Sequence, residues 1–281
     1  MPVGKLIRPD DAAFRPCTIP KKTVLFSIDV ETDFGSSEVV ALSQLGRLLD
    51  LADDLGIPLT AFVEGQFFET RHEICSQLID RGVDVQLHCY DHGTNGDTPA
   101  LLERSVAAYA DYCNALPRGY RAHTYRLSAD LYRALIKNGF KWDSSILPAI
   151  AQGGNFDRRY RAGDYLVFEE RMIEFPVATW ARIPIPLNHS YRLLIGRPAE
   201  AALRRFFGPR NLVAYNMHMV DLVRCGSLGK ANLPPLVNLL YRYIWAFDRR
   251  DTFDSLRNVI GYLDAMGYEF SHTDALYRKI A

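Results

Sequence analysis

Two histidines stand four residues apart in the segment DVQLHCYDHGT, which runs over residues 84–94 and has Asp91 between them. They are His88 and His92, two of only seven histidines among 281 residues. A four-residue spacing puts both imidazoles on one side of a helical turn, close enough to share a metal ion. Two separate, hydrogen-bonded histidines are the alternative, and a third ligand nearby would favour the metal.

A group of carboxylates follows the apolar segment VLFSI. Asp29, Glu31 and Asp33 are spaced by two, so all three could point to one side of an extended chain. Their mutual repulsion is costly unless a cation or an arginine lies nearby. One carboxylate can complete a site of two histidines and one acid, which is the layout of a catalytic metal, while another takes a proton from water. Zinc suits these ligands, and iron, cobalt and nickel are alternatives.

An arginine and a late histidine could serve the same chemistry. Arg121 could pair with the base, orient it and hold its pKa down. His218, in the segment LVAYNMH, could be the general acid that protonates a leaving nitrogen. Taken alone, His218 would be a core histidine with its hydrogen bonds satisfied. It gains significance only if its strand returns beside the first one.

Elements that alternate between strand and helix must position these residues. We predict strands at residues 23–28, 57–65, 83–89, 119–125, 140–146 and 210–221, and a strand followed by a turn at 268–276. The periodicity of apolar residues predicts helices over residues 36–56, 72–82, 98–116, 128–139 and 253–267. This alternation is typical of an α/β protein with a parallel sheet, whose active site lies at the carboxyl ends of the strands. The polar residues named above would therefore meet there.

Composition narrows the class of protein. The 33 basic and 33 acidic residues give a formal net charge of zero, so there is no electrostatic reason to expect nucleic acid as a partner. Five cysteines without a CxxC pair argue against a disulfide framework or a structural zinc site. The N-terminal segment lacks the apolar region of a secretory signal, and no apolar run reaches the roughly 18 residues of a membrane span. We therefore expect a soluble, cytoplasmic protein.

Three segments stand apart from the alternation. We predict a loose leader at residues 1–22 and, within a single domain of residues 23–281, an irregular insertion at about 148–210 that is rich in Pro, Gly and Arg. Whether that insertion covers the site is left open. Leu233–Phe247 is rich in large apolar residues, which predicts a core or interface helix, with a helix lying on a membrane as the alternative.

In order and type, the motifs resemble those of the NodB-like polysaccharide deacetylases, carbohydrate esterase family 4. The matching segments read SIDVETD, HCYDH, RAHTY, KWDSS and LVAYNMH, and the resemblance spans residues 23 to about 275. It implies a single domain with a distorted (β/α)7 barrel of the NodB type and a divalent metal. It also implies hydrolysis of an N-acyl group, usually acetyl, from an amino sugar.

The resemblance implies roles for the residues that do the chemistry. Asp29 is similar to the catalytic base, Arg121 to the residue that fixes this base, and His218 to the catalytic acid. Either Asp221 or Asp143 would hold His218 charged.

The resemblance also implies a metal site. His88 and His92 are similar to the metal-binding histidines of the family. The usual first motif has two adjacent aspartates, whereas Val30 follows the first acid here. We therefore assign Glu31 as the acidic ligand, as in divergent branches of the family, with Asp33 as the competitor.

Three further residues are expected to contact the substrate. Trp142 is similar to a wall of the acyl pocket, and the backbone N–H of Tyr90 or of a neighbour would stabilise the oxyanion. His123 stands where the family usually has a proline, and it would either line the site or fill space.

The expected substrate is an amino sugar in a cytoplasmic precursor of a surface polysaccharide such as lipopolysaccharide O-antigen. The sugar could be free, nucleotide-linked or lipid-linked. The apolar segment Leu233–Phe247 would suit peripheral contact with a membrane or a homo-oligomer interface. Two alternatives stand: a deformylase or cyclic-amide hydrolase that uses the same site, or a carbohydrate-binding protein that kept the fold and lost the activity.

Overall fold

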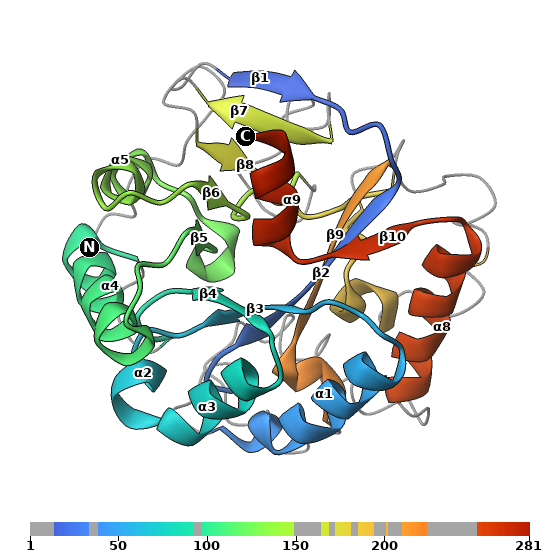
Figure 1. Cartoon of the computed structure of the whole chain (residues 1–281), viewed down its shortest axis with the longest axis horizontal. Helices are drawn as coiled ribbons and strands as arrows, with labels where there is room; N and C mark the ends of the chain where they lie inside the picture. Colours follow the sequence, from blue (N-terminus) through green and yellow to red (C-terminus); the bar gives the residue numbers. More distant parts are fainter. Residues whose placement is uncertain are drawn as a thin grey trace, which may run out of the picture.

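A computed structural model of the chain gives bounds for ten β-strands, three 3₁₀-helices and seven α-helices within the residues that it describes. Figure 1 shows their arrangement. The described residues are 14–33, 39–92, 97–148, 164–168, 172–180, 185–193, 201, 210–223 and 252–281. Among them, no helix is both long and apolar enough to cross a lipid bilayer.

Seven parallel strands in the described residues form the wall of a barrel. Their order around the wall is β9 (Leu212–His218), β2 (Thr23–Val30), β3 (Thr60–Val63), β4 (Asp84–Leu87), β5 (Gly119–Tyr120), β6 (Trp142–Asp143) and β8 (Ile173–Glu174). Between β8 and β9 the wall is not closed by a ladder, and within the described part of the chain one parallel bridge, Val177 to Ala214, joins the two sides. The predicted α/β fold with a distorted seven-stranded barrel is confirmed.

Helices cover the outside of this wall (Figure 1). They are α1 (Leu45–Asp54), α2 (Phe67–Thr70), α3 (His72–Asp80), α4 (Pro99–Cys113), α5 (Ala129–Lys137) and α8 (Thr252–Ala265), while the 3₁₀-helices η1 (Val40–Gln44), η2 (His123–Tyr125) and η5 (Met219–Leu222) follow strands or loops. In α1, Leu45, Leu48, Leu49 and Ala52 recur at three- and four-residue steps and are all buried. In α5, the Ser128 side chain accepts the Leu131 N–H at 3.1 Å and so caps the first turn of the helix.

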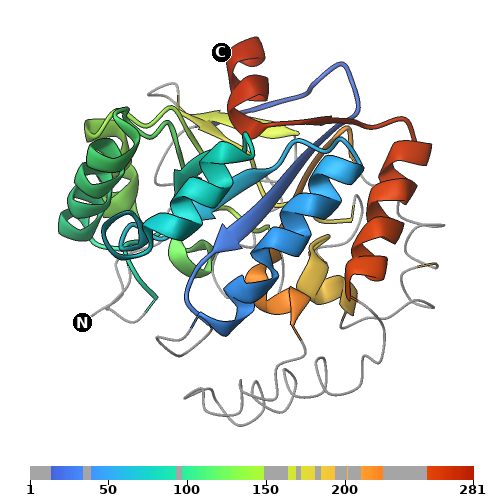
Figure 2. The same ribbon diagram turned by 60° about the horizontal axis from the view of Figure 1, so that its bottom comes forward.

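The amino ends of the strands are closed by α9 (Thr273–Ile280). The Thr273 hydroxyl lies 3.0 Å from that of Thr60 at the start of β3, and the Asp274 N–H donates to Asp84 at the start of β4. β10 (Glu269–Ser271) leads into this helix and pairs with the first residues of β2. Figure 2 shows α9 at one end of the barrel and η1 and η5 at the other. The carboxyl ends of the strands lie at the end opposite α9 (Figure 2).

Two of the predicted irregular segments contain strands. Residues 14–17, within the predicted leader, form strand β1 (Phe14–Cys17), which pairs antiparallel with β7 (Tyr165–Phe168). Strand β8 lies inside the predicted insertion and belongs to the barrel wall. Strands of two to four residues carry too few alternating positions to be recognised from sequence. Most of residues 148–210 and all of Leu233–Phe247 lie outside the described residues, so their predicted structures stay predictions.

Candidate active site

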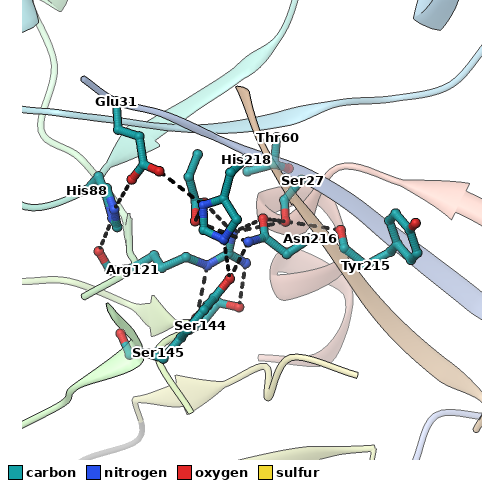
Figure 3. A network of polar contacts seen from close by, with 12 residues as sticks. Ser27, Glu31, Thr60, His88, Arg121, Ser144, Ser145, Tyr215, Asn216 and His218 are labelled. Atoms are coloured by element: carbon teal, nitrogen blue, oxygen red, sulfur yellow. Dashed lines mark hydrogen bonds and ion pairs between the residues drawn. The ribbon is translucent and has the colours of Figure 1, made fainter. Parts of the chain in front are cut away.

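Polar side chains from four strands meet at the carboxyl end of the barrel (Figure 3). Asp29 and His218 are register partners on β2 and β9. Glu31 directly follows β2, His88 directly follows β4 and Arg121 directly follows β5. The side chains of Asp29, Glu31, His88 and Arg121 are 4% exposed or less, so their charges must be balanced within the site.

Glu31, His88 and His92 form a compact group of possible metal ligands. Glu31 Oε2 lies 3.2 Å from His88 Nε2 and 2.6 Å from His92 Nε2, and the two Nε2 atoms are 3.3 Å apart. The Nδ1 atom of His88 is 2.6 Å from the carbonyl oxygen of Arg121, which can only accept, so Nδ1 carries the hydrogen. In its neutral form, His88 then has its lone pair on Nε2, which faces the Glu31 carboxylate. Acceptor atoms that face one another this closely fit a shared cation.

The charges of this group are strongly coupled. Burial acts to raise the pKa of Glu31, but His92, His218 and His88 outweigh it and hold that pKa well below its ordinary value. Burial likewise opposes a charge on His88, yet Glu31 and Asp29 raise the pKa of His88 to about 9. Without a metal, the negative charge of Glu31 is therefore balanced by a proton on a neighbouring imidazole such as His88. A bound divalent cation would replace such a proton.

Asp29 is held by two donors. Arg121 Nη1 donates to Asp29 Oδ1 at 2.7 Å, and Asn216 Nδ2 donates to Asp29 Oδ2 at 3.1 Å. Arg121 Nη1 also donates to Asn216 Oδ1 at 2.6 Å, which fixes the orientation of that amide. The rest of the guanidinium is bound to Ser144, through its hydroxyl at 2.9 Å and its carbonyl at 3.1 Å. The structure thus brings together the predicted base and the predicted arginine.

His218 lies beside both carboxylates. Its Nδ1 is 3.1 Å from Glu31 Oε1 and 3.4 Å from Asp29 Oδ2. Its side chain is 24% exposed, whereas those of Asp29 and Glu31 are 1% and 4% exposed, so the imidazole stands at the open side of the group. Burial opposes a charge on this ring, but Glu31 and Asp29 outweigh it and raise the pKa of His218 to about 10. A charged His218 fits the predicted proton donor.

The two candidates to support His218 do not bind its ring. The Asp221 carboxylate accepts the backbone N–H of His218 at 2.9 Å and the Ser190 hydroxyl at 2.8 Å. Asp143 accepts the hydroxyl of Ser145 at 2.6 Å. Asp221 therefore fixes the backbone of His218, while the carboxylates of Asp29 and Glu31 face its imidazole.

Asp33, the competing ligand, is used elsewhere. Its Oδ2 accepts the N–H of Val40 at 2.8 Å, and its Oδ1 accepts the N–H of Ala41 at 3.0 Å. Both carboxylate oxygens thus bind backbone groups at the start of η1. Between the two acids, the structure places Glu31 among the histidines.

Trp142, which is predicted as a wall of the acyl pocket, does not lie among the residues that form this site. Its ring is fully buried against Phe62 and Phe175, and its indole N–H donates to Asp274 on α9 at 3.3 Å. A Cβ atom on Gly119 would lie 2.1 Å from the indole, so the ring fills the space that this glycine leaves. Trp142 belongs to the amino end of the barrel, because α9 closes that end.

The Tyr90 side chain also points away from the site. Its hydroxyl donates to Glu69 on α2 at 2.9 Å, and the Arg104 guanidinium lies 4.3 Å from its ring centroid. The side chain therefore packs among the outer helices. The role of a backbone N–H in this loop stays a prediction.

His123 packs against the metal group. Its ring is edge-on to that of His92, with the centroids 4.0 Å apart. Its Nδ1 is buried without a hydrogen-bond partner in the structure. Burial, reinforced by His92 and His88, lowers the pKa of His123 to about 3, so the ring is neutral. His123 therefore lines the site as an uncharged surface.

Sequence reasoning missed three residues that contact this group. Asn216 stands two residues before His218 on the same strand, so alternation along β9 could have placed it on the same face. Cys89 offers a thiol within 4.8 Å of ligand atoms of His88 and His92, although burial raises the pKa of that thiol well above its ordinary value. Tyr125, whose hydroxyl lies 3.4 Å from His218 Nε2, had no recognisable signal.

Two curated proteins are similar in sequence to part of this chain. The chain is 32% identical over 106 residues to a peptidoglycan deacetylase of Helicobacter pylori, and 27% identical over 122 residues to the peptidoglycan deacetylase-like protein FGM2 of Gibberella zeae. These matches cover 36% and 41% of this chain, and only 36% of the length of either relative. No protein-family model matches the chain.

Solved structures agree on the fold. A protein assigned as a polysaccharide deacetylase from Mycobacterium smegmatis superimposes with a TM-score of 0.59 at 17% identity, covering 94% of this chain and 93% of its own. The predicted resemblance to NodB-like polysaccharide deacetylases is thereby confirmed.

Proteins with other functions share the fold. The allantoinase PuuE superimposes with a TM-score of 0.51 at 13% identity, covering 92% of this chain and 91% of its own. A pseudoenzyme of carbohydrate esterase family 4 from Bacillus anthracis reaches 0.50 at 13% identity, covering 96% and 72%. Function must therefore be argued from the site, because the fold does not decide it.

Proposed function

We propose that this chain is a divalent-metal-dependent hydrolase that removes the N-acetyl or another N-acyl group from an amino sugar. The observation that carries the proposal is the meeting of Glu31, His88 and His92 within 3.3 Å of one another. Asp29 and His218 flank this group, as a base and an acid must. A site with a metal ligand set, a buried base and a proton donor is suited to amide hydrolysis.

Glu31, His88 and His92 would hold the metal, which when bound supplies electrophilic activation of an acyl carbonyl and of water. The hydrogen bond from His88 Nδ1 to the Arg121 carbonyl orients one ligand ring. Three protein ligands leave coordination positions for water and substrate, as catalytic sites require.

Proton movements are assigned to this chain's own residues. Asp29 takes a proton from the attacking water, while Arg121 and Asn216 hold its two oxygens in place. His218 gives a proton to the amide nitrogen as the C–N bond breaks, so that the products are a free amine and a carboxylic acid. The raised pKa of His218 supports this assignment, because the ring is charged at neutral pH.

The finer identity of the substrate is part of the proposal. A cytoplasmic precursor of a surface polysaccharide such as O-antigen, with the amino sugar free, nucleotide-linked or lipid-linked, fits a protein whose described cysteines Cys17, Cys75, Cys89 and Cys113 are all free thiols. The names of the relatives support a second candidate substrate, peptidoglycan. Zinc is the proposed metal, since imidazole and carboxylate ligands suit it. A peripheral membrane contact or a homo-oligomer would be compatible with either substrate.

The test is release of acid and amine from a panel of substrates. Zinc- and cobalt-loaded protein would be incubated with N-acetyl and N-formyl amino sugars, their nucleotide-linked forms, peptidoglycan fragments and allantoin. We expect acetate and free amine from at least one amino sugar, and no product from the Asp29→Asn variant. Turnover of allantoin alone would instead make the chain a cyclic-amide hydrolase. Absence of turnover on every substrate, with metal bound, would contradict the proposal and favour an inactive sugar-binding protein.

A further inference from the structure

The turn after Arg121 has an unusual backbone. Among the described non-glycine residues, positive φ occurs at Asn114, Thr124 and Tyr125. Asn114 is the C-cap of α4, where asparagine commonly adopts this conformation. Thr124 and Tyr125 are adjacent, at φ 52° and 57°, and a β-branched or bulky residue is rarely found there. Strain of this kind persists where the surroundings favour it, and it is concentrated at functional sites.

The strained turn points the Tyr125 hydroxyl into the candidate active site. Tyr125 is 6% exposed, and its hydroxyl lies 3.4 Å from His218 Nε2. The two rings are edge-on, with their centroids 6.3 Å apart. Asn216 Nδ2 also donates to the Tyr125 oxygen. The hydroxyl therefore contacts the ring that we propose as the acid and the amide that holds the base.

Hydrogen-bond chemistry determines the direction of these contacts. Asn216 Oδ1 accepts from Arg121, so the Asn216 NH₂ group is the donor to Tyr125. The Tyr125 oxygen accepts from that amide and lies 3.4 Å from His218 Nε2, so it can also accept from a protonated Nε2. Nδ1 of His218 faces two carboxylates, which only accept, so Nδ1 carries a hydrogen. Both nitrogens of His218 are then held in defined roles by neighbours on opposite sides of the ring.

We propose that Tyr125 is a positioning residue, whose hydroxyl orients the imidazole of His218 for proton delivery to the leaving nitrogen. This inference rests on the proposed function. Burial, followed by the nearby Asp29 carboxylate, raises the pKa of Tyr125 well above its ordinary value, so the hydroxyl keeps its hydrogen. The strained turn places the Tyr125 hydroxyl beside His218, and this placement accounts for the free energy that the strain costs.

The choice of leaving group separates this role from a structural one. An amide needs a proton on its leaving nitrogen, whereas 4-nitrophenyl acetate expels nitrophenolate without one. We expect Tyr125→Phe to lower kcat on the N-acetyl amino sugar by about 10- to 100-fold and to change kcat on the ester by less than about twofold. Equal losses on both substrates, or no loss on the amide, would overturn the inference.

Two further variants serve as controls. Tyr109→Phe removes a buried hydroxyl that donates to the Val85 carbonyl at 3.0 Å, away from the site, and both rates should stay unchanged. Tyr125→Gly suits the positive φ, so its backbone is not a reason for misfolding, and it should show the same amide-selective loss.

An activity-independent measurement covers the case in which the wild type turns over neither substrate, which would count against the proposed function alone. In ¹⁵N-labelled, zinc-loaded protein, the His218 ring signals would be assigned by comparison with His218→Gln. We expect Tyr125→Phe to shift the Nε2 resonance and broaden the ring signals, because one of the two supports of the ring is lost. Identical His218 signals in wild type and Tyr125→Phe would overturn the inference about Tyr125.

Discussion

The two ends of the barrel use buried side chains in opposite ways. At the carboxyl end, the side chains that face one another include Asp29, Glu31, His88 and Arg121, each at most 4% exposed. At the amino end, the barrel interior holds a cluster of buried apolar residues, which are Leu25, Phe62, Trp142, Ile173, Phe175, Leu212 and Ala214, and α9 covers them. Charges without water need exact partners, whereas apolar side chains need only to fill space. We therefore expect the carboxyl end to serve the proposed reaction and the amino end to stabilise the fold.

Arg121 joins the two ends. Its guanidinium lies 3.9 Å from the Phe62 ring centroid, while its hydrogen bonds go to Asp29, Asn216 and Ser144. An arginine can stack on an aromatic face and still bind a carboxylate in the plane of its nitrogens. The apolar layer thus supports the charged one directly.

The comparison predicts that changes at the carboxyl end act on catalysis, and the largest effect should come from the base. Asp29→Asn keeps the shape of the side chain but removes its ability to take a proton. We expect kcat on the best N-acyl substrate to fall by about 10²–10⁴-fold with metal content unchanged. Steady-state kinetics and elemental analysis of the same sample would measure both. A variant that retains wild-type kcat would remove Asp29 from the mechanism.

Changes at the amino end should act on stability. Trp142→Ala removes a fully buried indole packed on Phe62 and Phe175, so we expect the free energy of unfolding to fall by about 3–5 kcal/mol. Denaturant unfolding would measure the loss, and the folded variant should keep its metal. A small stability loss combined with a large change in substrate specificity would instead return Trp142 to the acyl pocket.

A third prediction concerns a carboxyl pair between the two ends. Asp143 and Glu174 are register partners on β6 and β8, one residue beyond Trp142 and Ile173. Burial, followed by the Asp143 carboxylate, raises the pKa of Glu174 well above its ordinary value. As the pH rises above the unfolded pKa of about 4.3, the unfolded chain releases this proton while the folded chain keeps it, so stability falls.

Glu174→Gln removes that pH dependence while keeping an oxygen for the Ile146 N–H. We expect the variant to be more stable than wild type by about 1–3 kcal/mol at pH 8. The difference should be near zero at pH 4, where glutamate is protonated in both states. Unfolding curves at the two pH values would test this, and a difference independent of pH would refute the proton on Glu174.

The smallest expected effect separates two neighbouring acids. Asp33→Ala removes the cap of η1, so we expect a stability loss of about 1 kcal/mol with metal content and kcat unchanged. Thermal unfolding and elemental analysis would provide the readout. Loss of metal from this variant, with Glu31→Gln retaining it, would reverse our assignment of the acidic ligand.

The sequence predicted the meeting of Asp29, Glu31, His88, Arg121 and His218 because each lies at or just beyond the end of a parallel strand. That argument needs only the alternation of elements. The same argument could not predict whether a side chain on a short strand lies near the amino end or the carboxyl end of the barrel. Trp142 lies on β6 and Ser144 directly follows this strand, yet the first binds α9 and the second binds Arg121.

Local backbone conformation was the other limit. The contact of Tyr125 with His218 depends on two successive residues at positive φ, for which neither Thr124 nor Tyr125 gives a signal. The direction of the Tyr90 side chain had no signal for a similar reason, because Glu69 and Arg104 on other elements set it in the loop after β4. Contacts between distant segments decide such directions, and local pattern does not contain them.

The central claim is that Glu31, His88 and His92 hold a divalent metal, and metal content tests it most directly. Elemental analysis would compare purified wild type with the His88→Ala/His92→Ala variant, each incubated with zinc and dialysed. The account predicts close to one zinc per wild-type chain and almost none in the variant, with both proteins folded. A wild type that stays empty after incubation with zinc, cobalt and nickel, or a variant that retains its metal, would contradict it.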